Sequence, residues 1–111
     1  MLLAVAAACG SDDSGGSQTE GEQIARAEGC AGCHGQDFGG AAGPGWTGLA
    51  GSEVELADGT TVVADDDYLT RAITDPGAEE AAGFSIDMPA NNLTDDEVAA
   101  IVAYINTLAD A

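Results

Sequence analysis

The sequence contains no lysine and only two arginines, Arg26 and Arg71, against 20 aspartates and glutamates. Its formal net charge is −18 at pH 7 over 111 residues. A protein that binds nucleic acid must neutralise phosphates with basic side chains, so this composition excludes a nucleic-acid partner. The acidity itself has two interpretations: an electrostatic field that steers a basic partner, or adaptation of the surface to salt and solubility.

Large side chains and long apolar runs are also scarce. The chain has 16 glycines, but its aromatic residues are limited to Phe38, Trp46, Tyr68, Phe84 and Tyr104. The length allows one small domain, and a domain of this size gains much of its stability from a cofactor. A planar apolar cofactor at the centre would explain both the few aromatics and the many glycines.

A short apolar run stands at the N-terminus. Residues 2–8, LLAVAAA, precede Cys9, and a stretch rich in glycine, serine and acid continues to residue 18. Seven or eight apolar residues are too few to span a bilayer as a helix. The order resembles a bacterial lipoprotein signal, except that the positively charged start of such a signal is missing.

This resemblance implies a signal peptide over 1–8, truncated if the assigned start lies inside a longer signal. It also implies a lipid on Cys9, a flexible linker over 9–18 and a folded domain over 19–111. The domain would then be exported and lipid-anchored, on the periplasmic side or outer face of the cytoplasmic membrane. The alternative is an ordinary signal cut elsewhere, which would leave Cys9 incidental.

The pattern after residue 18 predicts helices at both ends of the domain. Thr19 is suited to cap a helix over 20–32, which would carry the sequence CAGCH at its C-terminal end. Thr94 and Glu97 form a capping-box pattern before the last helix. In that helix, apolar residues recur at helical spacing: Val98, Ile101, Val102, Ile105 and Leu108.

The middle of the chain predicts one hairpin and one further helix between two long loops, 35–51 and 77–93. Residues 52–64 alternate as in a hairpin, with Val54 and Leu56 facing Val62 across an Asp58-Gly59 turn. Asp65 or Asp66 would cap the helix DDYLTRAIT, which Pro76 halts. Loops this long in a small domain are explained by a buried cofactor.

The sequence Cys30-Ala31-Gly32-Cys33-His34 has three chemical interpretations. A redox disulfide of the thioredoxin type would stand at a helix N-terminus among alternating strands and helices, a pattern that this chain lacks. A structural zinc site needs four nitrogen or sulfur ligands. The chain has three cysteines and one histidine, and Cys9 lies before the linker. Only Cys30, Cys33 and His34 remain as zinc ligands, which is one fewer than a structural site needs.

The third interpretation, attachment of a c-type haem, requires only residues that are present. Cys30 and Cys33 would form thioether bonds, and His34 would be the proximal iron ligand. His34 is the only histidine, and Met88 is the only methionine apart from Met1. Met88 is therefore the candidate sixth ligand, and His/Met ligation raises the potential of a cytochrome c.

With these residues in view, the domain resembles a class I cytochrome c. It is most similar to the cytochrome c domain on subunit II of some haem–copper oxidases. The resemblance rests on an ordered series of segments: GEQIARAEGCAGCHG, then GPGWTGLAGSEVELADGTTVVADDDYLTRAITDP, then AGFSIDMPANNLTDDEVAAIVAYINTL. It implies an all-α class I cytochrome c fold, with three to four helices around one covalent haem c, long loops and one small β-hairpin.

The resemblance also implies roles for residues around the haem. The carbonyl of Pro44 would accept a hydrogen bond from His34, while Trp46 and Tyr68 would line the pocket or reach a propionate. Arg71 could neutralise a propionate, but the interpretation that we favour places it on a solvated helix face. Ordinary core packing and a turn proline are the alternatives for the other three residues.

The same resemblance implies that the last helix packs across the first. Ile101 and Tyr104 would lie near Gly21 and Ile24. Ala25 departs from the family pattern, which usually has an aromatic residue at this position. This departure weakens the detailed picture of the helix crossing but does not affect the haem site.

The function implied is one-electron transfer by a carrier that is not an enzyme. The donor would be a quinol-oxidising complex or a dehydrogenase, the acceptor a terminal oxidase, and the membrane would be reached through the lipid anchor. Two alternatives stay open: a fixed electron-transfer subunit of a larger oxidoreductase, or a ligand-binding haem sensor if Met88 does not bind the iron.

Overall fold

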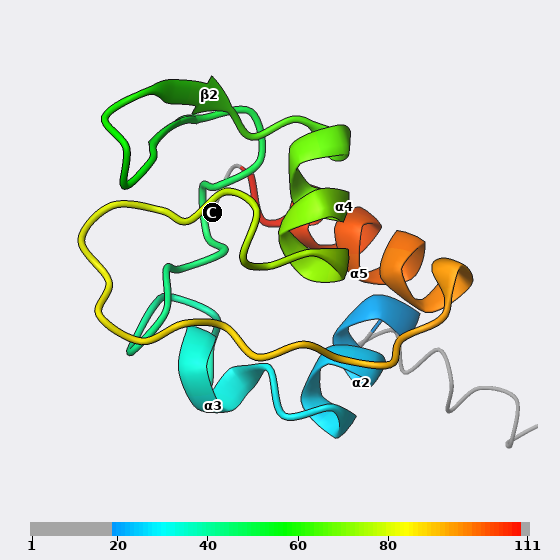
Figure 1. The fold of residues 1–111 in the computed structure, drawn as a ribbon. Coiled ribbons are helices and arrows are strands. Elements are labelled where there is room, and N and C mark those ends of the chain that lie inside the picture. Colours follow the sequence, from blue (N-terminus) through cyan, green and yellow to red (C-terminus); the bar gives the residue numbers. More distant parts are fainter. Residues whose placement is uncertain (1–18, 110–111) are drawn as a thin grey trace, which may run out of the picture.

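The structure, a computed structural model, describes residues 19–109; the predicted signal peptide, Cys9 and linker lie outside the described residues. Within this range the chain forms four helices and one two-stranded antiparallel sheet, in the order α2, α3, β1, β2, α4, α5. Figure 1 shows α2, α4 and α5 clustered together, with α3 and the hairpin on opposite sides of the long loops. No helix among the described residues is long and apolar enough to cross a membrane.

The first predicted helix is divided into two. α2 spans Glu20–Ala27, and α3 spans Ala31–His34. Thr19 caps α2 as expected, because its side chain accepts a hydrogen bond from the backbone N–H of Glu22. The prediction of one helix over 20–32 is therefore wrong.

Gly29 is the physical reason for the break. Its φ of 85° is left-handed, a conformation that glycine adopts without a Cβ penalty. The N–H of Gly29 then bonds the carbonyl of Arg26 at 3.2 Å, and that of Cys30 bonds the carbonyl of Ala25 at 2.9 Å. These two bonds close the helix as a Schellman motif, and α3 starts immediately afterwards as a separate turn.

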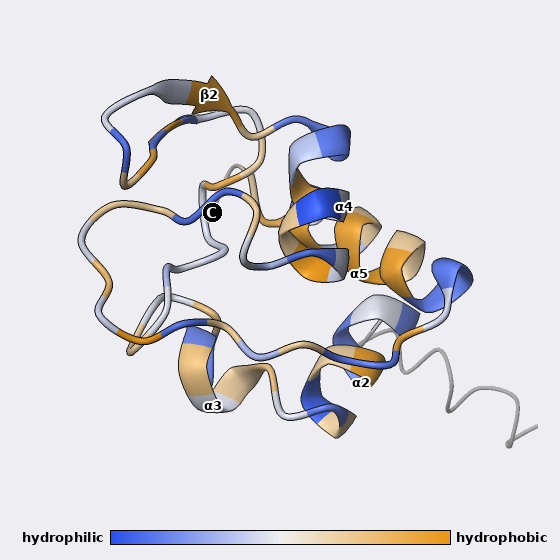
Figure 2. Ribbon diagram, in the orientation of Figure 1, coloured by the Kyte–Doolittle hydropathy of each residue, from blue (hydrophilic) through white to orange (hydrophobic). Residues whose placement is uncertain are grey.

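α5, spanning Asp95–Thr107, begins at the predicted capping box. The side chain of Thr94 accepts from the N–H of Glu97, and the Glu97 carboxylate accepts from the N–H of Thr94. α5 carries five buried residues: Val98, Ile101, Val102, Tyr104 and Ile105. Figure 2 shows this helix as the most continuously hydrophobic element.

α5 packs against α2, as the sequence predicts, and the crossing lies at Gly21. A Cβ on Gly21 would overlap the carbonyl oxygen of Ala100 and lie 2.8 Å from the Cβ of Tyr104. Glycine is needed here because the two backbones approach so closely. Ala25, on the same helix, is fully buried without an aromatic ring.

The hairpin and α4 follow the predicted order. β1 spans Glu53–Glu55 and β2 spans Thr61–Val63, with Val54 opposite Val62. Leu56 does not face Val62; its N–H bonds the carbonyl of Thr60 instead, and it pairs with Ala81 of the second loop.

α4 spans Asp66–Thr74 and packs against α5. Asp65 is its N-cap, since its carboxylate accepts from the N–H of Tyr68. The helix ends at Asp75, directly before Pro76, where the sequence predicted the halt.

The second long loop connects α4 to α5 and crosses in front of α3 and α2, as Figure 1 shows. Backbone bonds tie its beginning to the hairpin, from Ala57 to Glu80 at 2.8 Å and from Ala82 to Glu55 at 2.9 Å. Near its end, the side-chain amide of Asn91 donates to the carbonyl of Ile73 at 2.8 Å. The loop is thus anchored at both ends, and its middle, which contains Met88, lies between the two anchors.

Candidate functional site

The sequence CAGCH folds as one helical turn. Cys30 is the N-cap of α3 and His34 is its last residue. His34 is buried, Cys30 is half-buried and Cys33 is exposed. The motif therefore presents one thiol at the surface and encloses the imidazole.

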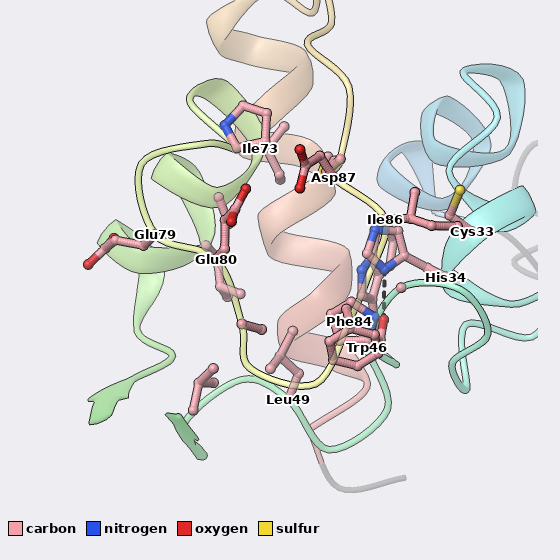
Figure 3. A pocket seen from close by; sticks show the side chains of 18 of the residues that line it. Cys33, His34, Trp46, Leu49, Ile73, Glu79, Glu80, Phe84, Ile86 and Asp87 are labelled. Carbon is pink, nitrogen blue, oxygen red and sulfur yellow. Dashed lines mark hydrogen bonds between the residues drawn. The ribbon is translucent and has the colours of Figure 1, made fainter. Parts of the chain in front are cut away.

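His34 is held in one tautomer. Its Nδ1 lies 2.7 Å from the carbonyl oxygen of Pro44, the bond drawn as a dashed line in Figure 3. Because a carbonyl can only accept, Nδ1 must carry the proton. The lone pair of Nε2 is then available to a metal, and the bond to Pro44 raises the basicity of the imidazole.

A second contact fixes the loop that carries Pro44. The N–H of Gly43 donates to the carbonyl of Cys33 at 2.7 Å, and the side chain of His34 lies against Gly43. A Cβ on Gly43 would lie 3.3 Å from the imidazole. The loop thus approaches the histidine as closely as a side-chain-free residue permits.

His34 lines a cavity whose walls come mainly from the two long loops and α4, with single residues from β1 and α5. Figure 3 shows His34 and Trp46 together on one side of it, with Glu79 and Glu80 on the other side. Its apolar lining includes Leu49, Val54, Leu69, Ile73, Phe84 and Ile105. Met88 and Cys33 line the same cavity.

The cavity opens at the second loop. Phe84, Ile86 and Met88 line it and are also exposed to solvent. These three side chains therefore form its mouth. The sequence predicted a role for Met88 in this loop, and the structure brings Met88 to the cavity that His34 lines.

The predicted pocket residues Trp46 and Tyr68 both line the cavity and both are buried. Burial raises the pKa of Tyr68; the nearby Glu79 raises it further and Arg71 opposes this effect. Trp46 stacks on Phe38, with ring centroids 4.4 Å apart and planes 8° apart. Trp46 is therefore part of the cavity wall and of the core at once.

Arg71 does not line the cavity. Its guanidinium Nε pairs with the Glu79 carboxylate at 2.9 Å, and half of its side chain is exposed. The structure therefore does not bring Arg71 to the pocket as expected. Its half-exposed side chain pairs with Glu79, and Glu79 is the residue of this pair that lines the cavity.

Three carboxylates line the cavity that the sequence did not single out: Glu79, Glu80 and Asp87. They lie in the second loop, which has no periodicity that would indicate a side chain's direction. Of the two cations in the described residues, Arg71 pairs with Glu79 and Arg26 pairs with Glu22 at 3.0 Å.

The geometry of the cysteines also bears on the other two interpretations of CAGCH. Cys30 is the N-cap of the separate turn α3 and Cys33 lies within that turn, so the prediction that the pair ends one continuous helix is wrong. Burial nevertheless raises the pKa of Cys30, whereas a reactive thiol needs a lowered one. Among the described residues, no group of three His, Cys, Asp or Glu side chains could hold a metal ion, so these residues do not supply a structural zinc site.

Phe38 is the residue of this region that sequence reasoning missed. It is fully buried, although it lies in a glycine-rich loop. Its ring packs edge-to-face on Tyr104, with centroids 5.6 Å apart. The aromatic contact to α5 thus comes from the loop after α3, and Ala25 of α2 does not supply it.

These residues fit a covalently attached planar cofactor with a central metal. The cavity is mainly apolar, and the thiol of Cys33, an imidazole that offers Nε2 and a thioether all line it. Cys30, the second thiol, stands at the start of the same helical turn as Cys33. An imidazole and a thioether are a set that haem iron accepts.

The family model described as cytochrome c matches residues 18–109, which is most of the chain and includes every residue that the structure describes. No curated protein matches the sequence.

Proposed function

This chain belongs to the cytochrome c family, and on that premise we propose that it is a one-electron carrier with His34 and Met88 as axial ligands. The family accounts for a covalently bound haem c, for which Cys30 and Cys33 are the attachment residues of the motif. The fold of four helices and one small two-stranded sheet is that of a class I cytochrome c.

One observation carries the proposal: His34 donates through Nδ1 to Pro44 and lines a cavity that Met88 also lines. Haem iron would supply the one-electron couple. The chain's residues hold and tune it: the carbonyl of Pro44 keeps the imidazole in the ligating tautomer, and Leu69 and Ile73 help to exclude water.

The carrier role follows from the ligand set. With His34 and Met88 both bound to haem iron, no coordination position would remain for a substrate, and electrons would enter and leave through the mouth of the cavity. Such encounters use small, transient interfaces. Membership of the cytochrome c family supports a role in electron transfer rather than in catalysis.

We further propose that the carrier works at a membrane surface after export. Lipidation at Cys9 would tether it through residues 10–18 and raise its effective concentration near its partners. The proposed donor is a quinol-oxidising complex or a dehydrogenase, and the proposed acceptor is a terminal oxidase. Those partners would present basic surfaces to this acidic domain.

A fixed subunit of a larger oxidoreductase is the second candidate, favoured by the similarity to the domain on subunit II of some haem–copper oxidases. The two functions differ in how the protein leaves the membrane. A fixed subunit would co-purify with a complex in mild detergent, whereas a carrier would separate from it.

The decisive experiment is expression with the export and haem-attachment machinery, followed by haem staining of a denaturing gel. We expect one covalently bound haem per chain in the wild type and none in Cys30→Ala/Cys33→Ala. An unstained wild-type band would overturn the assignment of the cofactor.

The Met88 ligand is tested separately with carbon monoxide. The ferrous wild type should bind it poorly, Met88→Ala should bind it readily, and Ile86→Ala should behave as the wild type. Ile86 is the matched control because it is an exposed residue of the same loop and also lines the cavity. If the ferrous wild type binds carbon monoxide readily and Met88→Ala leaves its spectrum unchanged, the protein is a ligand-binding haem protein instead.

A further inference from the structure

Phe38 has an unusual backbone for a large residue. Its φ is 58°, and it is the one non-glycine residue with positive φ among the described residues. It is also completely buried. A bulky side chain keeps this strained conformation only where its surroundings hold it, and such sites concentrate where function requires a fixed geometry.

The left-handed turn directs the backbone of Phe38 toward the segment that follows Pro44. The carbonyl of Phe38 accepts from the N–H of Trp46 at 2.8 Å and from the N–H of Thr47 at 3.2 Å. Its own N–H donates to the carbonyl of Gly35 at 2.9 Å. Phe38 therefore ties the end of α3 to the chain beside Trp46.

The ring of Phe38 is held by both terminal helices. The guanidinium of Arg26 in α2 lies 4.8 Å from its centroid, a cation–π distance. The ring of Tyr104 in α5 meets it at 77°. Trp46 stacks flat on the same ring, so the plane of the indole follows the plane of the Phe38 ring.

The segment held in this way contacts His34 twice. The centroid of Trp46 lies 5.1 Å from that of the imidazole, with the planes tilted by 39°. Pro44, two residues before Trp46, accepts the Nδ1 proton at 2.7 Å. Both contacts depend on where the chain from 44 to 46 lies, and Phe38 is the residue that fixes its end.

We infer that Phe38 is a positioning residue for His34: through Trp46 and Pro44 it sets the plane of the imidazole and its hydrogen bond, and thereby the reduction potential. The inference rests on the proposed function, since His34 must ligate the iron for its geometry to affect a potential. Phe38 itself does not line the cavity, so its effect is transmitted by its neighbours.

The direction of the effect follows from the hydrogen bond. A strong bond from Nδ1 to a carbonyl makes the imidazole more basic, and a more basic ligand favours the ferric over the ferrous state. Loosening the segment from 44 to 46 should weaken that bond. The midpoint potential should therefore rise when the flat ring of Phe38 is removed.

The test compares haem-loaded Phe38→Leu and Phe38→Met with Ile101→Ala. Ile101 is the matched control because it is fully buried in α5 but does not line the cavity. Each variant is characterised by its midpoint potential, by the g-values of the ferric low-spin EPR spectrum, which report the orientation of the axial ligands, and by its thermal midpoint. Phe38→Met fills more of the space than Phe38→Leu and provides a second variant if the latter folds poorly.

We expect both Phe38 variants to raise the potential and shift the g-values, whereas Ile101→Ala lowers the thermal midpoint with both spectroscopic values unchanged. Unchanged potential and g-values in a folded Phe38→Met would overturn the inference and leave only a structural role. A wild type without haem, or with Met88 unligated, would instead overturn the proposed function, so the two failures are distinguishable.

Discussion

At the scale of single residues, the close approach of backbone segments explains more of the structure than side-chain chemistry does. Gly21 has no Cβ where α5 passes, and Gly43 lies against the imidazole of His34. His34 in turn depends on one backbone carbonyl, that of Pro44. Gly21, Gly43 and Pro44 contribute by the position of their backbones. Substitutions at these positions that look conservative should therefore have large effects on the structure.

Gly21→Ala should destabilise the domain by about 3 kcal/mol, at the upper end of what overpacking costs, because the new methyl group overlaps the Ala100 carbonyl. Urea unfolding of the haem-loaded protein measures this free energy. Gly77→Ala is the control, since nothing lies within 4 Å of the Cβ it adds. Equal unfolding midpoints for the two variants would contradict the close crossing of α2 and α5.

Tyr68 makes the domain sensitive to alkaline pH. Burial raises its pKa above the ordinary value of 10.0, so the folded state retains the proton at pH values where the unfolded chain has lost it. The stability due to Tyr68 is therefore complete below about pH 10 and is lost as the pH rises through the folded-state pKa.

The measurement is thermal unfolding of wild type and Tyr68→Phe in a series from pH 8 to about pH 11. We expect the wild type to lose stability more steeply than Tyr68→Phe above about pH 10, while the two curves run parallel below it. Parallel curves over the whole range would indicate a solvated phenol.

At the scale of elements, helix ends are specified by local hydrogen bonds. The capping box of Thr94 and Glu97 starts α5, and Asp65 starts α4. In each cap the two bonded residues are three positions apart in the chain, so the cap can be predicted from the sequence. The division between α2 and α3 is less visible, because it depends on the left-handed conformation of Gly29.

Thr94→Ala should cost about 1 kcal/mol of unfolding free energy, because the N–H of Glu97 loses its side-chain acceptor. Glu97→Gln is the matched control, since a glutamine can still accept from the N–H of Thr94. Chemical denaturation should therefore place Glu97→Gln close to the wild type. An equal loss in both variants would mean that charge at the start of α5 matters more than the cap.

At the scale of the whole molecule, the main feature is the excess of negative charge. Both arginines of the chain are paired, with Glu22 and with Glu79, against a formal net charge of −18. The remaining carboxylates, of which Glu80 and Asp87 line the cavity, give the surface around the redox site a negative potential. We therefore expect a redox partner to bring positive charge or to meet the domain at high ionic strength.

Small redox reagents of opposite charge test this field directly. We expect a cationic oxidant to react with the ferrous protein roughly tenfold or more faster than an anionic one of similar potential at low salt. Added salt should bring the two rates together, since the Debye length falls to about 10 Å at 0.1 M. Rates that are independent of reagent charge would leave salt adaptation as the explanation of the acidity.

The ligand inventory, the helix caps and the apolar face of α5 were determined by the sequence alone. One histidine and one methionine besides Met1 leave few possible iron ligands, and caps and helical periodicity arise from contacts between residues close in the chain. For the same reason the register of Val54 with Val62 was predictable.

Only the tertiary structure decided how the loops meet. It buried Phe38 between Arg26 and Tyr104, directed Arg71 to Glu79, and brought Glu80 to the cavity. The contact of Phe38 with Tyr104 joins segments far apart in the sequence. Glu79 and Glu80 lie in an irregular loop, which has no period from which a side chain's direction follows. The identity of the site is thus a local property of this chain, whereas the surroundings that tune it are a property of the fold.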